Sequence, residues 1–405
     1  MNYLKTSISI LTFFVCIYPA QSIAQDKTAE IISNLNAIIK PINTIKADSS
    51  FEDIDFLKET LKDKEIISLG EATHGTREFY DYKDRLIRFL VTNMHYKAIS
   101  FESDYIAIEK IDDYINSKTD SLISLPGSAL LYTNHPMIEW LKKYNQTKAI
   151  AEKVHVYGLE VRNFDNIINK ILKVFPEIET ADKLLLEKVK NSGYAMVKRK
   201  DLNELKGTIK NLQKACNNEL IKHYITLLSQ IGNPDGYEDN GFRDQTMAYN
   251  AIWIIERTPN NKLITWAHNG HVAKKGYLNY PIMGTYLNEK YGSKYFVIAT
   301  DFNHGEVNVR KFIAKNKPVS NFQPLYYPEV NTSKGYEYYF KQCKFKNFIL
   351  DVDSASKVSI LNSFLTEPLD MRLIGALSIP EKKKLSISKN FDLIVFFDKT
   401  RRAWD

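Results

Sequence analysis

The sequence predicts an α/β protein with a central, mostly parallel sheet that is flanked by helices and carries an inserted helical subdomain. Three observations predict this fold. The 405 residues, 44% hydrophobic and 25% charged, have a globular composition. Short apolar runs alternate with amphipathic segments, as in βα units. A stretch between two of these runs, about residues 164–231, has helical spacing throughout.

The N-terminus has the layout of a secretory signal. One lysine precedes an apolar run from about Ile8 to Tyr18, and small residues follow that run. The run is too short to span a bilayer as a helix. We therefore expect cleavage after Ala24, which makes residues 1–24 a signal peptide and leaves residues 25–405 as one α/β domain without a membrane segment. The expected location is the periplasm, with full secretion as the alternative.

The predicted elements begin with two helices, at 27–45 and 51–61. Apolar runs then predict strands, at 65–69, 96–101, 153–159, 262–266, 295–300, 347–352 and 391–397. Amphipathic spacing predicts helices after the first two strands, at 77–94 and 105–115. Helices separate the later strands less clearly, so we allow for a mixed sheet. The helical insertion interrupts the chain between the third and fourth strands, where it could line a cleft or serve packing alone.

Charge and cysteine content exclude several classes of protein. The net charge of +7 is small against 55 basic and 48 acidic residues. No dense basic stripe is present, so a nucleic-acid partner is not expected. Of three cysteines, Cys16 lies in the signal, and only Cys216 and Cys343 remain. That number rules out a disulfide scaffold and a multi-cysteine zinc site, while a single disulfide stays open.

The stretch SLGEATHGTREF, residues 68–79, carries the first candidate chemistry. Glu71 and His74 follow the first strand in its turn towards the next helix. Open α/β sheets bind ligands beyond the carboxyl ends of their strands. A carboxylate beside an imidazole can fix the tautomer of the ring and raise its basicity, as a water-activating base requires. A helix-capping glutamate and a turn histidine are the ordinary alternative, since this motif is weak by itself.

Two further strand ends carry ionisable groups. His268 and His271 follow the fourth strand, so three of the eight histidines fall in two turns. Glu102 closes the second strand, and we expect it in the same cleft. Asp104, two residues later, is instead expected to cap the following helix. Arg243 opens the helix before the fourth strand, where it could neutralise Glu71 or Glu102, bind an oxyanion, or form a surface ion pair.

These motifs together resemble the erythromycin esterase family. The resemblance runs in order from about residue 51 to 397 and is carried by GEATHGTREFYDYKDRLIRFL, AISFES, the RD..MA.N pattern of residues 243–250, and WAHNGHV. It implies an α/β core with helical extensions around a cleft, and hydrolysis of a macrolide lactone such as that of erythromycin. It also implies that the catalytic pairs are Glu71 with His74 and His268 with His271. Glu102 matches the second acid of the family, and Lys83 a basic residue on its first helix.

The expected reaction is hydrolysis of a carboxylic ester by an activated water, with no cofactor. His74, oriented by Glu71, would remove a proton from water, while His268 or His271 would polarise the carbonyl or protonate the leaving alkoxide. Glu102 would hold one of these two histidines. The expected partner is a small ester or a macrolide. Two alternatives remain: a metal-dependent hydrolase with Glu71, His74, His268 and His271 as ligands, or a binding protein without turnover.

Overall fold

A nine-stranded mixed sheet forms the centre of the computed structural model, which describes residues 18–119, 129–192, 197–233, 236, 241–276, 278–311, 320–377 and 382–404. The strands lie in the order β1 (Lys40–Pro41), β8 (Asn347–Asp351), β11 (Leu393–Thr400), β6 (Tyr295–Arg310), β2 (Ile66–Glu71), β5 (Leu263–His268), β3 (Ala98–Asp104), β4 (His155–Glu160). A ninth strand, β7 (Phe322–Tyr327), pairs with β6. The pairs from β11 to β4 are parallel, whereas β1–β8, β8–β11 and β6–β7 are antiparallel. The predicted α/β class and its mixed sheet are confirmed.

Helices cover both faces of the sheet, which explains why β2 and β5 are buried along their whole length. Side chains of one face pack against α2 (Leu57–Leu61), α3 (Arg77–Met94), α4 (Tyr105–Ile115) and α5 (Ala129–Gln146). The other face packs against α1 (Tyr18–Ile38), α10 (Phe242–Ile255), α11 (Asn269–Val272), α12 (Met283–Tyr291), α13 (Tyr336–Phe340), α14 (Val352–Ser356), α15 (Ser359–Thr366) and α16 (Ile387–Asn390). A short hairpin of β9 (Leu369–Arg372) and β10 (Lys382–Leu385) completes the C-terminal part.

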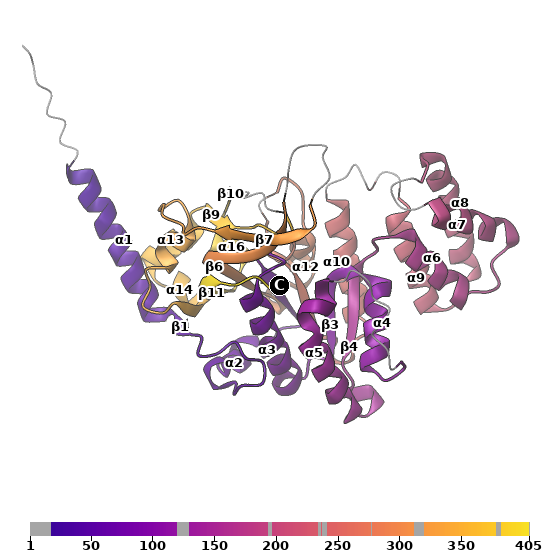
Figure 1. Ribbon diagram of the computed structural model, residues 1–405, viewed down its shortest axis with the longest axis horizontal. Coiled ribbons are helices and arrows are strands. Elements are labelled where there is room, and N and C mark those ends of the chain that lie inside the picture. The colour runs from indigo at the N-terminus through magenta and orange to yellow at the C-terminus, as the bar shows by residue number, and fades with distance from the viewer. Residues whose placement is uncertain are drawn as a thin grey trace, which may run out of the picture.

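The predicted insertion is helical in the part of it that the structure describes. Its four helices are α6 (Phe164–Val174), α7 (Thr180–Ser192), α8 (Arg199–Ala215) and α9 (Glu219–Ile231). They lie at the end of the molecule beyond β4 and α4 (Figure 1). They share an apolar core of their own, which Tyr105 and Ile106 of α4 join to the main domain.

Most predicted elements keep their positions, but several boundaries differ, and the helix predicted at 51–61 is a 3₁₀ turn (Glu52–Ile54) followed by α2. α3 and α4 have the predicted bounds, whereas the first helix ends at Ile38 and not at residue 45. Lys40 and Pro41 instead pair with β8, which draws the chain into the sheet. Strand β6 extends ten residues beyond its predicted end, because its second half pairs with β7.

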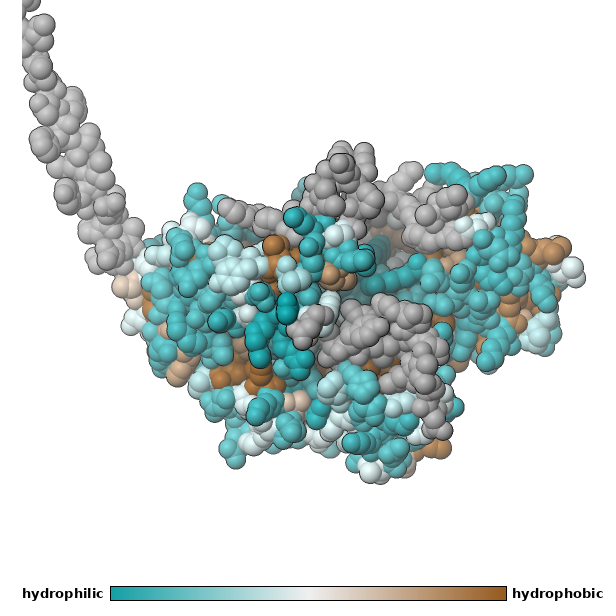
Figure 2. All heavy atoms as spheres, viewed as in Figure 1, coloured by the Kyte–Doolittle hydropathy of each residue, from teal (hydrophilic) through white to brown (hydrophobic). Residues whose placement is uncertain are grey.

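The N-terminal turns of α1 project from the body of the molecule (Figure 1). This helix runs through the predicted cleavage point after Ala24, and residues 1–17 of the predicted signal lie outside the described part of the chain. None of the helices within the described ranges has the length and apolarity that a membrane span needs. Cys216 and Cys343 are buried and both are free thiols. The face in Figure 2 is mostly hydrophilic, with scattered apolar residues.

Candidate active site

Three neighbouring strands bring the predicted site residues together. β5 lies between β2 and β3, and in the parallel register Glu71 of β2 stands opposite His268 of β5. Glu102, near the end of β3, accepts a hydrogen bond from the backbone N–H of His268 at 2.9 Å. The carboxyl ends of these strands therefore form one edge, where the fold class places its ligands.

Glu71 is a buried carboxylate that is held by three donors. Its Oε2 accepts from Lys83 Nζ and from Trp266 Nε1, each at 2.8 Å, and its Oε1 lies 2.6 Å from His74 Nδ1. Burial alone would raise the pKa of Glu71, but the Lys83 ammonium and the His74 contact lower it to about 2. The Lys83 ammonium also lies 4.5 Å from the centre of the Trp266 ring. Glu71 is therefore an ionised acceptor at neutral pH.

The contact with Glu71 sets the tautomer of His74. Because an ionised carboxylate can only accept, His74 Nδ1 carries the proton, and Nε2 keeps its lone pair. None of the described residues donates a hydrogen bond to that Nε2, and the side chain is 27% exposed. An imidazole that is buried on its Nδ1 side and open at Nε2 has the geometry of a general base.

The turn that carries His74, residues 72–76, is held from three directions. Gly375 accepts a hydrogen bond from the His74 N–H at 3.1 Å, and its own N–H donates to Ala72 at 3.0 Å. The carbonyl of Gly75 accepts from Asn308 of β6 and from Ala403, after β11, at 2.9 and 3.0 Å. A Cβ on Gly75 would lie 2.0 Å from the Asn308 oxygen, so only glycine fits there. The position of the imidazole is thus fixed by backbone contacts.

His268 is a neutral donor next to His74, with ring centres 5.5 Å apart. Its Nδ1 accepts from the Gly270 N–H at 3.1 Å, so the ring proton lies on Nε2, which is 3.3 Å from the Ala72 carbonyl. Burial, followed by the neighbouring His74, lowers the pKa of His268 to about 3. Because the hydrogen bond from His268 Nε2–H to the Ala72 carbonyl is long, a substrate oxygen can replace that carbonyl as the acceptor.

His271 is the charged histidine of the site. Its Nδ1 lies 2.7 Å from Asp244, and its Nε2 lies 3.4 Å from Glu102. Burial opposes the charge, but Glu102 and Asp244 raise the pKa of His271 to about 10. Arg243 Nη1 lies 3.1 Å from the same Nε2. With both ring nitrogens protonated, that approach is a like-charge contact, which Glu102 and Glu160 compensate.

Arg243 links the histidines to a second acid, Glu160. Its Nη2 donates to Glu102 and Glu160 at 2.8 and 2.9 Å, and its Nε donates to Glu160 at 2.7 Å. Of the two partners predicted for Arg243, Glu102 is confirmed, whereas Glu71 is paired with Lys83 instead. Three acids (Glu102, Glu160, Asp244) thus face three cations (Arg162, Arg243, His271) in one contact network, and Glu71 and Lys83 form a separate ion pair. The charges balance within the network and within the pair.

The structure brings together all seven predicted residues and adds others that the sequence did not single out. Asp104 caps α4 as predicted, accepting from the Ala107 N–H at 3.0 Å. The added side chains are Glu160, Asp244, Trp266 and Arg162. Asp244 and Trp266 lie within the quoted motifs RD..MA.N and WAHNGHV, which is the signal in the sequence that could have found them. Within the described ranges, no group of three or more His, Cys, Asp and Glu side chains has an arrangement suited to a metal ion.

Comparison with known proteins gives a consistent result. The sequence profile of the erythromycin esterase family matches residues 91–400, which begins after Glu71, His74 and Lys83. The protein YbfO of Bacillus subtilis, named as a proposed hydrolase, is 25% identical over 309 residues, covering 62% of this chain and 68% of YbfO. Erythromycin esterase type II of Escherichia coli is 22% identical over 352 residues, covering 73% of this chain and 79% of that protein.

Two solved structures share the fold. A Bacillus cereus protein superposes with a TM-score of 0.80 at 24% identity, covering 93% of this chain and 98% of that one. A mutant erythromycin esterase, in an open conformation, superposes with a TM-score of 0.69 at 16% identity, covering 89% and 97% of the two chains.

Proposed function

The chain belongs to the erythromycin esterase family, and we propose on that premise that it hydrolyses carboxylic esters by general-base activation of water. Family membership and the names of the relatives support a hydrolase. The observation that carries the proposal is the pair of Glu71 and His74, in which Nδ1 is committed to the carboxylate and Nε2 is open. A macrolide lactone is the substrate that we propose first, since relatives of the chain are named for erythromycin.

The proposed reaction needs one proton to move twice. His74 Nε2 takes a proton from water as the oxygen attacks the ester carbonyl, and the ionised Glu71 stabilises the imidazolium that forms. The carbonyl oxygen becomes an oxyanion, to which His268 donates from Nε2, with the charged His271 behind it. When the C–O bond breaks, His74 returns the proton to the leaving alkoxide. A carboxylic acid and an alcohol result; for a lactone these are one ring-opened molecule.

We propose that this reaction uses no metal ion. Both oxygens of Glu71 accept hydrogen bonds from protein donors, and Nδ1 of His268 accepts from a backbone amide. Three atoms that would have to bind the metal ion in the alternative, namely both Glu71 oxygens and His268 Nδ1, therefore already accept hydrogen bonds from the protein. Activity in the presence of a chelator, with no loss of rate, is the expected result. Loss of activity that added zinc or manganese restores would instead favour the metal-dependent alternative.

The test of the function is incubation of the purified protein with erythromycin and a panel of simple esters, followed by mass spectrometry. We expect a product heavier than erythromycin by one water, formed with or without chelator and formed about 10²–10⁴ times more slowly by His74→Ala. His135→Ala, which changes an exposed histidine of α5, is the matched control and should leave the rate unchanged. Cleavage of simple esters alone would overturn the macrolide proposal, and no turnover of any ester would overturn the esterase proposal.

We also propose that the protein is exported to the periplasm, because its N-terminus has the layout of a secretory signal. N-terminal sequencing of the protein recovered from the periplasmic fraction tests this. The expected first residue is Gln25. A cytoplasmic protein that keeps Met1 would contradict the proposal.

A further inference from the structure

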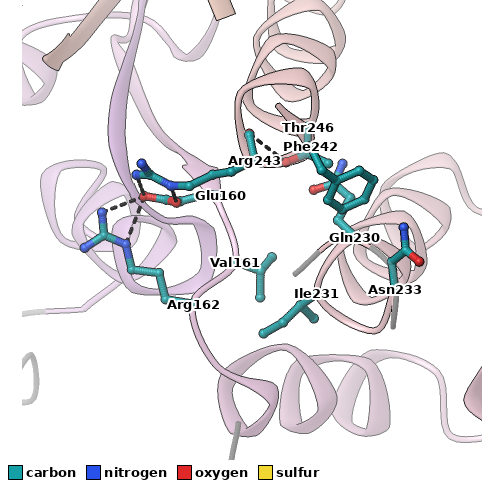
Figure 3. Close-up of a pocket in the computed structure, with 10 residues that line it drawn as sticks. Glu160, Val161, Arg162, Gln230, Ile231, Asn233, Phe242, Arg243 and Thr246 are labelled. Carbon is teal, nitrogen blue, oxygen red and sulfur yellow. Dashed lines mark hydrogen bonds and ion pairs between the residues drawn. The ribbon is translucent and has the colours of Figure 1, made fainter. Parts of the chain in front are cut away.

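Two acids outside the candidate active site, Asp301 of β6 and Glu337 of α13, are buried where these elements meet β9. The acids of the active site are paired, as Figure 3 shows for Glu160 between Arg162 and Arg243. Among the described residues, by contrast, no side-chain nitrogen of Lys, Arg or His lies within 4.0 Å of the carboxyl oxygens of Asp301 or Glu337. Burial of an unpaired acid lowers stability, so these two residues call for an explanation.

The two acids carry at most one negative charge at neutral pH. Burial raises the pKa of both carboxyl groups, and the charge of Glu337 raises the pKa of Asp301 further, well above its ordinary range. Asp370 adds to the rise in the pKa of Glu337, whereas the Arg372 guanidinium opposes the rise at both acids. Asp301 therefore holds a proton, and Glu337 is the stronger hydrogen-bond acceptor of the two.

Glu337 continues a backbone ladder that α13 interrupts. The N–H of Asp370 in β9 donates to the Lys334 carbonyl at 2.8 Å, in parallel pairing. In a longer ladder, the N–H of Arg372 would donate to the carbonyl of Tyr336. Tyr336 is the first residue of α13, however, and the carbonyls of a helix point along its axis. Glu337 Oε1 accepts from the Arg372 N–H instead, at 2.8 Å, and so anchors the last residue of β9.

The chain reaches the catalytic turn within three residues of this anchor. The N–H groups of Ile374 and Gly375 both donate to the Ala72 carbonyl, at 2.8 and 3.0 Å, and the Gly375 carbonyl accepts from the His74 N–H at 3.1 Å. The same Ala72 carbonyl lies 3.3 Å from Nε2 of His268. A shift of residues 373–375 would therefore move the proposed base and the acceptor of the neighbouring histidine together.

We propose that Glu337 is a positioning residue of the reaction, which fixes the end of β9 so that residues 373–375 hold the turn that carries His74. Glu337 acts through backbone hydrogen bonds and touches neither the substrate nor the reacting atoms. This inference rests on the proposed function, and it explains why an acid that lowers stability is buried at this place.

The first test is steady-state kinetics on an ester that the wild type cleaves. Glu337→Met removes the acceptor and should lower kcat about tenfold with little change in KM, because the base is misplaced and substrate binding is not. Glu337→Gln keeps an acceptor oxygen and should retain most of the wild-type kcat. Asp182→Met is the matched control, since it removes a buried acid of the insertion that accepts from Thr208 and Asn211. Equal losses of kcat in Glu337→Met and Glu337→Gln, or a change in KM alone, would overturn the proposal.

The second test needs no turnover. Hydrogen–deuterium exchange of the full chain, followed by mass spectrometry, should be about tenfold faster in Glu337→Met than in the wild type for peptides covering residues 72–76 and 373–376. Exchange there should stay at the wild-type rate in Glu337→Gln and Asp182→Met. Glu337→Ser, whose shorter side chain also withdraws the acceptor, should behave as Glu337→Met does, so the test does not depend on the folding of one variant.

The two tests separate the positioning role from the proposed function. Unchanged exchange at residues 72–76 in Glu337→Met and Glu337→Ser would overturn the positioning role even if esters are cleaved. Faster exchange there, in a protein whose wild type cleaves no ester, would support the link from Glu337 to the turn and overturn the proposed function.

Discussion

Replacing Lys83 with methionine removes the buried ammonium that neutralises Glu71, while keeping the length and much of the packing of the side chain. Both partners of this ion pair are almost completely buried. In the wild-type protein the pKa of Glu71 is about 2, against an ordinary 4.5. At 1.36 kcal/mol for each tenfold change in proton affinity, this difference corresponds to about 3 kcal/mol of net stabilisation of the carboxylate.

Without Lys83, burial becomes the dominant influence and should raise the pKa of Glu71 above 4.5. We therefore expect the acid limb of the kcat/KM profile to move towards neutral pH in Lys83→Met. The free energy of unfolding at pH 7 should fall by about 3 kcal/mol, since one charge of a buried pair loses its partner. An acid whose pKa is lowered in the folded protein stabilises the fold above its unfolded pKa, and this stabilisation is lost as pH falls through the folded pKa. The difference in unfolding free energy between variant and wild type should therefore shrink as pH falls from 4.5 to 2.

The assays are urea unfolding at pH 7 and kcat/KM between pH 4 and 9 on an ester that the wild type cleaves. Burial also lowers the pKa of Lys83 to about 8, so the wild-type rate should decline above that pH, and this decline should be absent in the variant. Lys58→Met is the control, because Lys58 is half exposed and its ion pair should contribute less than about 1 kcal/mol. An unchanged acid limb together with unchanged stability would refute the assigned role of Lys83.

Three further variants test other parts of the site. His74→Ala should lower kcat/KM by about 10²–10⁴, the contribution of a general base, and a smaller loss would contradict its role. His271→Gln should lower the free energy of unfolding more at pH 6 than at pH 10.5. The pKa of His271 is raised from 6.5 to about 10, so its charge stabilises the fold fully below pH 6.5 and this stabilisation is lost as pH rises through 10. An equal loss at both pH values, measured by denaturation, would refute the charge of His271. Glu78→Ala, which releases Arg401 beside the catalytic turn, should lower kcat more than it changes KM, and an effect on KM alone would argue against positioning.

The two catalytic turns could be located from the sequence because each follows an apolar strand directly. Glu71 and Trp266 end or flank such strands, and their burial follows from the strand pattern. Local sequence could not show that β2 and β5 are neighbours, because they are almost 200 residues apart in the chain. The grouping of three histidines in two turns, and the resemblance to a family, supplied that expectation.

Other contacts could not be predicted from the chain alone. Glu160 reaches Arg243 only because β4 pairs with β3, and the register of that pair shifts between Phe101 and Asp104. Such irregularities break the alternation on which sequence interpretation depends. The roles of the histidines were likewise undecided, because the neutral state of His268 and the charge of His271 depend on burial and on Asp244, which only the fold brings into contact.

The central claim is that Glu71 and His74 act as one general base, and a double-mutant cycle tests it most directly. The values of kcat/KM for wild type, Glu71→Gln, His74→Ala and the double variant should be measured on the same ester at neutral pH. If Glu71 acts only through His74, the double variant should be no slower than His74→Ala. Losses that simply multiply in the double variant would contradict the claim and show that the two side chains contribute independently.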